Sequence, residues 1–146
     1  MSATPRRCVV DASVGIKLFV DEPLSEQAHQ LFAGLVDDPP AQLYAPDLFF
    51  IECANILWKY IRRFGRSLAH SQADLADLSN LGLRATSTAE LMEEALTLAA
   101  QTGLTAYDAC YAALARRLEL PLVTADDTLF KAIDWAIWLG DLEEGQ

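Results

Sequence analysis

Residues 8–13 read Cys8-Val9-Val10-Asp11-Ala12-Ser13, an apolar run that ends in an acid and two small residues. Such a run is typical of a buried strand, and an Asp followed by Ser is typical of the turn into a helix. A second segment has the same form, because Leu122-Val123-Thr124-Ala125 is followed by Asp126. Acids that follow parallel strands lie at the same edge of a sheet, where open α/β folds bind their ligands. The two segments therefore predict an acidic site on a parallel sheet.

The remaining sequence alternates short strands with helices. We expect strands at 6–11, 43–46, 83–86, 121–125 and 136–139, and helices at 14–20, 25–36, 48–64, 71–81, 88–103, 105–118 and 127–133. Asp47 is expected to cap the long helix that Gly65 closes, and residues 37–40 to form a loop. This alternation predicts a parallel sheet covered on both faces. We expect one domain over residues 1–146, with a frayed acidic tail from Asp141.

Composition and charge limit the classes of function that are open to this chain. With 146 residues, 52% hydrophobic and 22% charged, the chain is predicted to be globular. Acids outnumber bases 21 to 11, the opposite of a generic nucleic-acid binder, and this balance favours a basic protein partner. The three cysteines fall in apolar segments and form no C-x-x-C pair, as expected for buried thiols in a reducing compartment. Without a signal peptide or a bilayer-length apolar run, we expect a cytoplasmic protein with no membrane contact.

The candidate site comprises Asp11, Glu52, Asp108 and Asp126. Each Asp stands at a predicted helix start and has a plain structural interpretation: Asp11 and Asp126 as N-caps, and Asp108 as the acid of a capping box that begins at Thr105. Glu52 is harder to explain structurally, because its helix is apolar around most of its circumference and an unpaired buried charge costs several kcal/mol. Gathered together, these carboxylates would make an oxygen-only pocket that Mg²⁺ or Mn²⁺ favours.

A polar stripe offers a second interpretation of Glu52. Steps of three or four residues along the long helix give Glu52, Asn55, Lys59, Arg62 and Arg66. Such a stripe is usually solvated surface. It also leads from an acid to a basic cluster, and could therefore follow a phosphate backbone away from a metal site. On this hypothesis Lys59, Arg62 and Arg66 would contact RNA, which answers the objection from net charge.

Short motifs in order along the chain resemble those of the PIN-domain ribonucleases. They read Asp11-Ala12-Ser13, Glu52-Cys53-Ala54-Asn55, Thr105-Ala106-Tyr107-Asp108 and Thr124-Ala125-Asp126. The contexts of the first and last motifs, Val9-Val10 and Leu122-Val123, look most like VapC-type toxins of toxin–antitoxin pairs. The resemblance extends from about Cys8 to Leu139, and the loop at Pro39-Pro40 and the acidic tail lie outside its core pattern.

The resemblance implies a three-layer α/β/α sandwich with a central, mainly parallel sheet. It implies a ribonuclease dependent on Mg²⁺ or Mn²⁺ that forms a homodimer and is inhibited by a cognate antitoxin protein. Carried over by position, Asp11 and Asp108 would be metal ligands, with Glu52 and Asp126 completing the catalytic site. Groups that orient carboxylates or waters would be Ser13, Asn55 and Thr124. Asp127 has no counterpart.

Three other classes of protein are alternatives to a nuclease. A phosphate-accepting receiver domain needs paired acids on its first strand and a Lys after a late strand, but Asp11 has no acidic neighbour and Lys131 falls in a predicted helix. An aspartyl-phosphate phosphatase needs a second Asp where this chain has Ser13. A catalytically idle PIN-like interaction module is the third alternative, and the presence of all the site acids argues against it.

Overall fold

The computed structural model describes residues 3–143. Its sheet has five strands in the order β3-β2-β1-β4-β5, and every neighbouring pair is parallel. The strands are β1 (Arg7–Val10), β2 (Gln42–Pro46), β3 (Arg84–Thr86), β4 (Leu122–Thr124) and β5 (Ala136–Trp138). Both neighbours of β1 lie far from it in sequence, so strand order reverses beside β1, where α/β sheets place their ligand sites.

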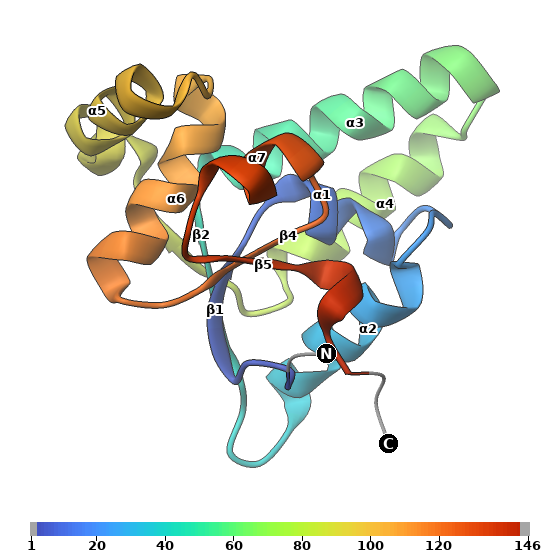
Figure 1. Ribbon diagram of the computed structural model, residues 1–146. Coiled ribbons are helices and arrows are strands. Elements are labelled where there is room, and N and C mark those ends of the chain that lie inside the picture. The colour runs from blue at the N-terminus through green and yellow to red at the C-terminus, as the bar shows by residue number, and fades with distance from the viewer. Residues whose placement is uncertain (1–2, 144–146) are drawn as a thin grey trace.

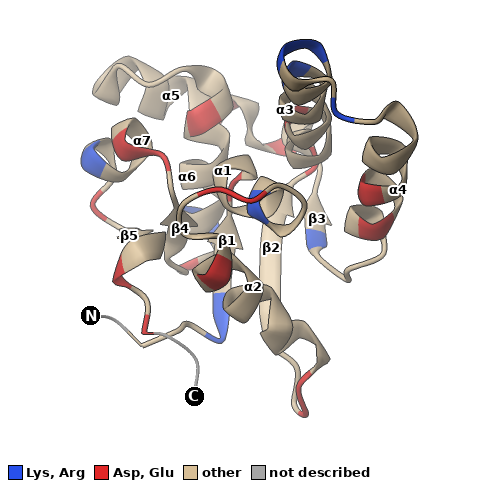
Figure 2. Ribbon diagram, turned by 90° about the vertical axis from the view of Figure 1, so that its right-hand side faces the viewer, with Lys and Arg blue, Asp and Glu red and all other residues tan. Residues whose placement is uncertain are grey.

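Helices cover both faces of this sheet. The α-helices are α1 (Ala12–Gly15), α2 (Ser25–Ala33), α3 (Leu48–Phe64), α4 (Leu68–Ser79), α5 (Met92–Thr102), α6 (Ala106–Leu118) and α7 (Asp127–Ala132). Short 3-10 segments follow at Ile16–Leu18, Gly34–Val36, Thr88–Leu91 and Leu139–Asp141. In Figures 1 and 2, α5 and α6 lie on one face, α2 lies on the other, and α3 with α4 extends beside β3. The predicted three-layer α/β/α fold with a parallel sheet is confirmed.

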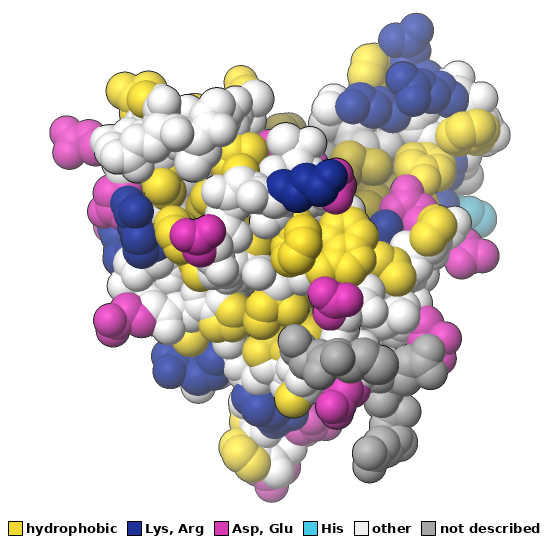
Figure 3. All heavy atoms as spheres, viewed as in Figure 1, with side chains coloured by type: hydrophobic (Ala, Val, Ile, Leu, Met, Phe, Trp, Pro, Cys, Tyr) yellow, Lys and Arg dark blue, Asp and Glu magenta, His cyan; other side chains and the backbone are white. Residues whose placement is uncertain are grey.

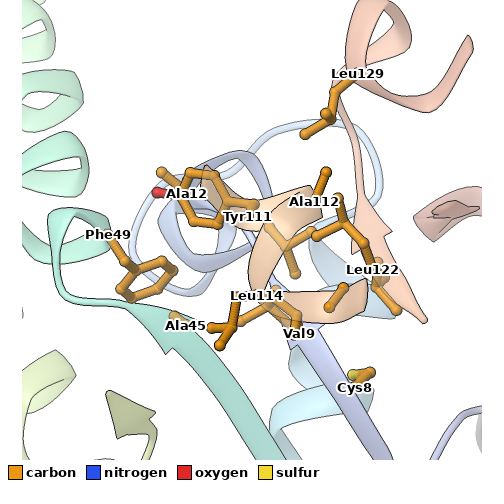
Figure 4. Close-up of a cluster of buried hydrophobic side chains, with 14 of the residues drawn as sticks. Cys8, Val9, Ala12, Ala45, Phe49, Tyr111, Ala112, Leu114, Leu122 and Leu129 are labelled. Carbon is orange, nitrogen blue, oxygen red and sulfur yellow. The ribbon is translucent and has the colours of Figure 1, made fainter. Parts of the chain in front are cut away.

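The core lies between the sheet and α6. Strand residues Val9, Leu43 and Leu122 have no exposed surface, and Ala109 to Ala115 on α6 are buried throughout. Figure 4 shows side chains of β1, β2, β4 and α6 meeting in this cluster. Cys8, Cys53 and Cys110 are buried free thiols within it. None of the helices within residues 3–143 has the length and apolarity needed to cross a bilayer.

A close approach between α1 and α3 sets the width of the site. A Cβ atom added at Gly15 would lie 2.4 Å from Cζ of Phe49, whose ring is fully buried. Only a glycine leaves room for that ring, so the missing side chain brings the start of α3 against the turn that follows β1. This packing carries Glu52, one turn further along α3, toward Asp11.

The prediction that the Asp47 side chain caps α3 is wrong. Asp47 stands at the N-cap position, but its backbone is helical and its carboxylate caps no α3 amide. The carboxylate instead accepts hydrogen bonds from the Thr88 amide at 2.8 Å and the Thr88 hydroxyl. That hydroxyl accepts the amide of Leu48 at 2.9 Å, so α3 is capped from the segment that follows β3.

Two further predictions need correction at their ends. The fourth helix begins at Leu68 rather than Ser71, because the Ser67 hydroxyl accepts the His70 amide at 3.1 Å and caps it. The chain is not frayed from Asp141, since a 3-10 turn ends there and Leu142 is 2% exposed within the core. The last part of the predicted tail, residues 144–146, lies outside the described residues.

Candidate active site

A cavity of about 830 Å³ opens at the carboxyl ends of β1 and β4. Residues from α3 and from the start of α6 form much of its lining. All the acids singled out from the sequence line it: Asp11, Glu52, Asp108 and Asp126. They come from the end of β1, from α3, from α6 and from the residues after β4, so the fold gathers side chains separated by up to 115 positions.

Asp11 is the most enclosed of the four acids, with 4% exposure. Its Oδ1 accepts the Ser13 hydroxyl at 2.6 Å and the Val14 amide at 3.2 Å, and its Oδ2 accepts the Thr124 hydroxyl at 2.6 Å. The N-cap interpretation of Asp11 therefore holds for one of these bonds. Because a carboxylate has about four lone-pair sites, about one remains for another ligand.

Thr124 links the two strand-end acids. It is fully buried, and its hydroxyl donates to Asp11 while accepting the backbone amide of Asp126 at 3.0 Å. Ser13 makes a parallel connection, because its hydroxyl donates to Asp11 and accepts the Ala125 amide at 2.9 Å. These bonds hold the ends of β1 and β4 in one register.

Asp126 and Asp108 differ in how their carboxylates are used. Oδ1 of Asp126 accepts the Leu129 amide at 3.0 Å, so this acid caps α7 as its plain interpretation requires. Asp108 gives only its amide to the Thr105 hydroxyl, at 3.2 Å. No described residue donates a hydrogen bond to the Asp108 carboxylate, so the capping box is half formed and this carboxylate remains available in the cavity.

Glu52 has a partner that the sequence interpretation missed. The hydroxyl of Tyr111 donates to Glu52 Oε1 at 2.5 Å, from α6 across to α3. The Tyr111 ring is 1% exposed and belongs to the core cluster of Figure 4. A buried tyrosine normally needs a partner for its hydroxyl. Tyr111 lies one helical turn after the candidate acid Asp108. This spacing, together with the need of a buried tyrosine hydroxyl for a partner, could have identified Tyr111 from the sequence.

Burial raises the pKa of three acids in the cavity, and for two of them the charge of a neighbouring acid raises it further. Burial raises the pKa of Asp11 to about 6, against the hydrogen bonds from Ser13 and Thr124, and the charge of Asp126 raises it further. Burial also raises the pKa of Asp108 to about 6, with added contributions from the charges of Asp126 and Glu52. The pKa of Glu52 is raised by burial, although the Tyr111 hydrogen bond opposes the shift. The acids therefore act as one electrostatic group, which a cation would stabilise.

The carboxylate oxygens that line the cavity are ligands of the kind that a hard divalent cation binds. In residues 3–143, no three His, Cys, Asp or Glu side chains come close enough together to form a metal site by themselves. Mg²⁺ commonly keeps several waters and is held by one or two carboxylates together with substrate phosphates. The oxygen-only donors and the room in the cavity suit that mode.

The other predicted residues are divided between this cavity and its surroundings. Asn55 and Lys59 line the cavity, next along α3 from Glu52. Arg66 lies beyond Gly65 and forms an ion pair with Asp74 of α4, so its guanidinium is partly committed there. Asp127 is outside the cavity lining and pairs with Lys131 at 2.9 Å. Lys131 is thus also away from the acids, which removes the lysine that a receiver domain needs.

The PIN domain family model matches residues 8–136 of the chain. The chain belongs to the PIN-domain family, and the family assignment made from the sequence motifs is confirmed. The acids at the ends of β1 and β4, Asp11 and Asp126, both lie within the matched residues.

Within that family the chain is similar to proteins of the VapC type. It is 36% identical over 125 residues to Ribonuclease VapC3 of Pyrobaculum aerophilum, which covers 84% of this chain and 92% of that protein. The crystal structure of PAE2754 from Pyrobaculum aerophilum matches with a TM-score of 0.72 and 27% identity, covering 92% of this chain and 90% of that one. A toxin–antitoxin complex from Klebsiella pneumoniae matches in fold, with a TM-score of 0.64, 20% identity, and 89% and 95% of the chains covered.

Proposed function

We propose that this protein is an endoribonuclease that hydrolyses RNA phosphodiesters with Mg²⁺ or Mn²⁺, and that it is the toxin of a VapBC-type pair. The observation that carries the proposal is the convergence of Asp11, Glu52, Asp108 and Asp126 on one cavity. Membership of the PIN-domain family and 36% identity to a ribonuclease support the same activity.

Each acid has a distinct part in this proposal. Asp11 and Asp108 are the principal metal ligands, and Glu52 and Asp126, which line the same cavity without closing on a common point, complete the site through waters on the cation. Ser13 and Thr124 fix the orientation of the Asp11 carboxylate through its two oxygens. Tyr111 fixes Glu52, and Asn55, which lines the cavity beside it, orients carboxylates or waters. Preformed hydrogen bonds of this kind hold ligands in the geometry that metal binding requires.

The bound cation would supply the chemistry that carboxylates lack, by making a water more acidic and by stabilising charge on the attacking and leaving oxygens. The carboxylates would hold the cation, and through it the negatively charged phosphate and the attacking water could be brought together in a cavity whose acids alone would repel the phosphate. One of these carboxylates would accept the proton of the attacking water.

The proposed partners are supported by the similarity to a VapC ribonuclease and by the net charge of the chain. A cognate antitoxin is supported by the likeness to Ribonuclease VapC3, and a formal charge of −10 favours a partner with a basic surface. The protein would act on RNA in the cytoplasm and assemble as a homodimer. Neither role requires a membrane.

The proposed function is tested by RNA cleavage in the presence and absence of EDTA. Single-stranded RNA should be cut with Mg²⁺ or Mn²⁺, left intact with EDTA, and cut again when the metal is restored. Asp108→Asn should abolish cleavage, while Asp127→Asn should retain it, because Asp127 pairs with Lys131 away from the cavity. Full cleavage by Asp108→Asn in metal-replete buffer would overturn the proposal.

A further inference from the structure

The second half of α3 carries an aromatic and basic surface next to the acids. Trp58, Lys59, Arg62 and Arg63 line a further hollow of about 280 Å³. Trp58 and Lys59 also line the acidic cavity, so the two spaces share a wall. Six residues separate Trp58 from Glu52, or about 9 Å along the helix axis. A substrate strand leaving the acids along α3 would meet this surface first.

Trp58 is unusual for a tryptophan because 48% of it is exposed. Its ring contributes little to the core, while the guanidinium of Arg62 lies 5.0 Å from the ring centroid, one helical turn further on. An Arg held over a tryptophan face by a cation–π contact is already oriented. Arg62 therefore places its positive charge on one face of the ring, and the exposed surface of Trp58 lines the hollow beside it.

The basic side chains of this surface form no ion pairs with other described residues. Within residues 3–143, Lys59, Arg62 and Arg63 take part in no ion pair, in contrast to Arg66, which contacts Asp74. Figure 2 shows Lys and Arg gathered at the end of α3, and Figure 3 shows dark-blue side chains there on the molecular surface. A chain with a formal charge of −10 therefore keeps a localised positive surface beside its acidic cavity.

We propose that Trp58, Arg62 and Arg63 form a nucleobase-binding subsite, in which an unpaired base of the substrate stacks on Trp58 and the arginines contact its flanking phosphates. This proposal rests on the proposed ribonuclease function. It assigns to the protein a recognition element for single-stranded RNA that is separate from the acids. Arg63 replaces Arg66 among the residues expected to contact RNA.

Nucleic acid fits this surface better than a protein does. The free groups are an aromatic face and positive charges, and single-stranded nucleic acids present bases and phosphates that match both. A basic protein partner, favoured by the overall charge, would be repelled by Lys59, Arg62 and Arg63. A double helix would leave no base free to stack, so the strand that binds here is unpaired.

The test is a binding measurement with two matched probes. One is a fluorescein-labelled ten-nucleotide single-stranded RNA, and the other has the same phosphates but abasic residues throughout. Binding is measured by fluorescence anisotropy in Mg²⁺, with Asp108→Asn in every protein so that RNA is not consumed. The added variants are Trp58→Ala, Trp58→Phe, Arg62→Gln and the control Phe64→Ala. Phe64 is an exposed aromatic on the same helix that lines neither space.

We expect Trp58→Ala to weaken binding of the normal RNA by roughly tenfold to a hundredfold. Trp58→Phe should recover most of that loss, and Trp58→Ala should bind the abasic probe as its parent does. Arg62→Gln should weaken both probes and lower the slope of log affinity against log salt by about 0.7. Phe64→Ala should bind like its parent.

Equal affinity of Trp58→Ala and its parent for the normal RNA would overturn the subsite and leave Trp58 to a protein contact. An equal loss on both probes would also overturn it, because the ring would then act only through the fold. Cleavage assays that compare the unmodified protein with Asp108→Asn distinguish the two proposals. If Asp108→Asn abolishes cleavage while Trp58→Ala binds normally, only the subsite fails; if Asp108→Asn still cleaves, the proposed function itself fails.

Discussion

The Tyr111 hydroxyl donates a hydrogen bond to Glu52 Oε1 at 2.5 Å, joining α6 to α3, two helices that both line the acidic cavity. The bond has a double effect, because it orients Glu52 and lowers the pKa of a carboxyl group that burial otherwise raises. The same contact raises the pKa of Tyr111 well above its usual range, with burial as the larger cause. Tyr111 therefore remains a neutral donor at any working pH.

Replacing this hydroxyl should affect catalysis more than folding. In Tyr111→Phe the buried ring remains, so the free energy of unfolding should change by about 1 kcal/mol. Cleavage and metal affinity should fall by roughly tenfold to a hundredfold, the usual effect of losing a group that positions a ligand. Because Glu52 loses the bond that lowers its pKa, the acid limb of the pH–rate profile should move to higher pH. Tyr44→Phe, which removes a hydroxyl that contacts Gln42 outside the cavity, is the control and should leave cleavage, metal affinity and the pH–rate profile unchanged.

Asp11→Asn should abolish cleavage and stabilise the metal-free fold. Burial raises the pKa of Asp11 to about 6, so at pH 7.5 the folded state holds a charge that the unfolded state holds more easily. Removing that charge should raise the free energy of unfolding by about 1–3 kcal/mol in EDTA. Urea denaturation measures the gain, and the exposed Asp127→Asn should show none. A clear loss of stability in Asp11→Asn would show that its hydrogen bonds matter more than its charge.

The metal-free protein should lose stability as pH rises from about 4 to about 6.5. Asp11 and Asp108 have folded pKa values of about 6 against a reference of 3.8, so in this interval the folded state binds more protons than the unfolded state. The stabilising contribution is full below the unfolded pKa and is lost above the folded pKa. Melting temperatures in EDTA across this range should fall, and the double variant Asp11→Asn/Asp108→Asn should give a flatter curve. Equal slopes for the two proteins would contradict the prediction.

Gly15→Ala should destabilise the protein by forcing α1 and α3 apart. The new methyl group would lie 2.4 Å from the Phe49 ring, which is fully buried and has no free space to enter. Overpacking of this kind costs about 1–3 kcal/mol, measurable by urea denaturation. Combining Gly15→Ala with Phe49→Leu should destabilise by less than the sum of the single changes, because the smaller side chain removes the clash. Strict additivity would place the cost elsewhere.

The sequence predicts the framework of the fold because its signals are local. The apolar runs that end at Val10 and Thr124 are short and continuous, and turn residues bound them, so strand positions and the placement of Asp11 and Asp126 follow directly. The parallel arrangement then accounts for their meeting. What the sequence does not reveal are contacts chosen by tertiary packing. Asp47 binds Thr88, 41 positions away, instead of capping its own helix.

The same limit applies to the candidate site. Periodicity places Arg66 on one stripe with Lys59 and Arg62, but the helix ends at Phe64 and the following turn directs Arg66 to Asp74. Tyr111 is invisible to a search for acids, since its part depends on Glu52 arriving from another helix. The distances among the carboxylates depend on side-chain positions in a cavity, which no spacing rule fixes.

The burial of Leu142 bears on how this protein should be engineered for study. Its side chain is 2% exposed and packs in the same hydrophobic core as Leu139, near the end of the described residues. Truncation before Leu142 would expose that core to solvent and favour aggregation, so any shortened variant should retain Leu142.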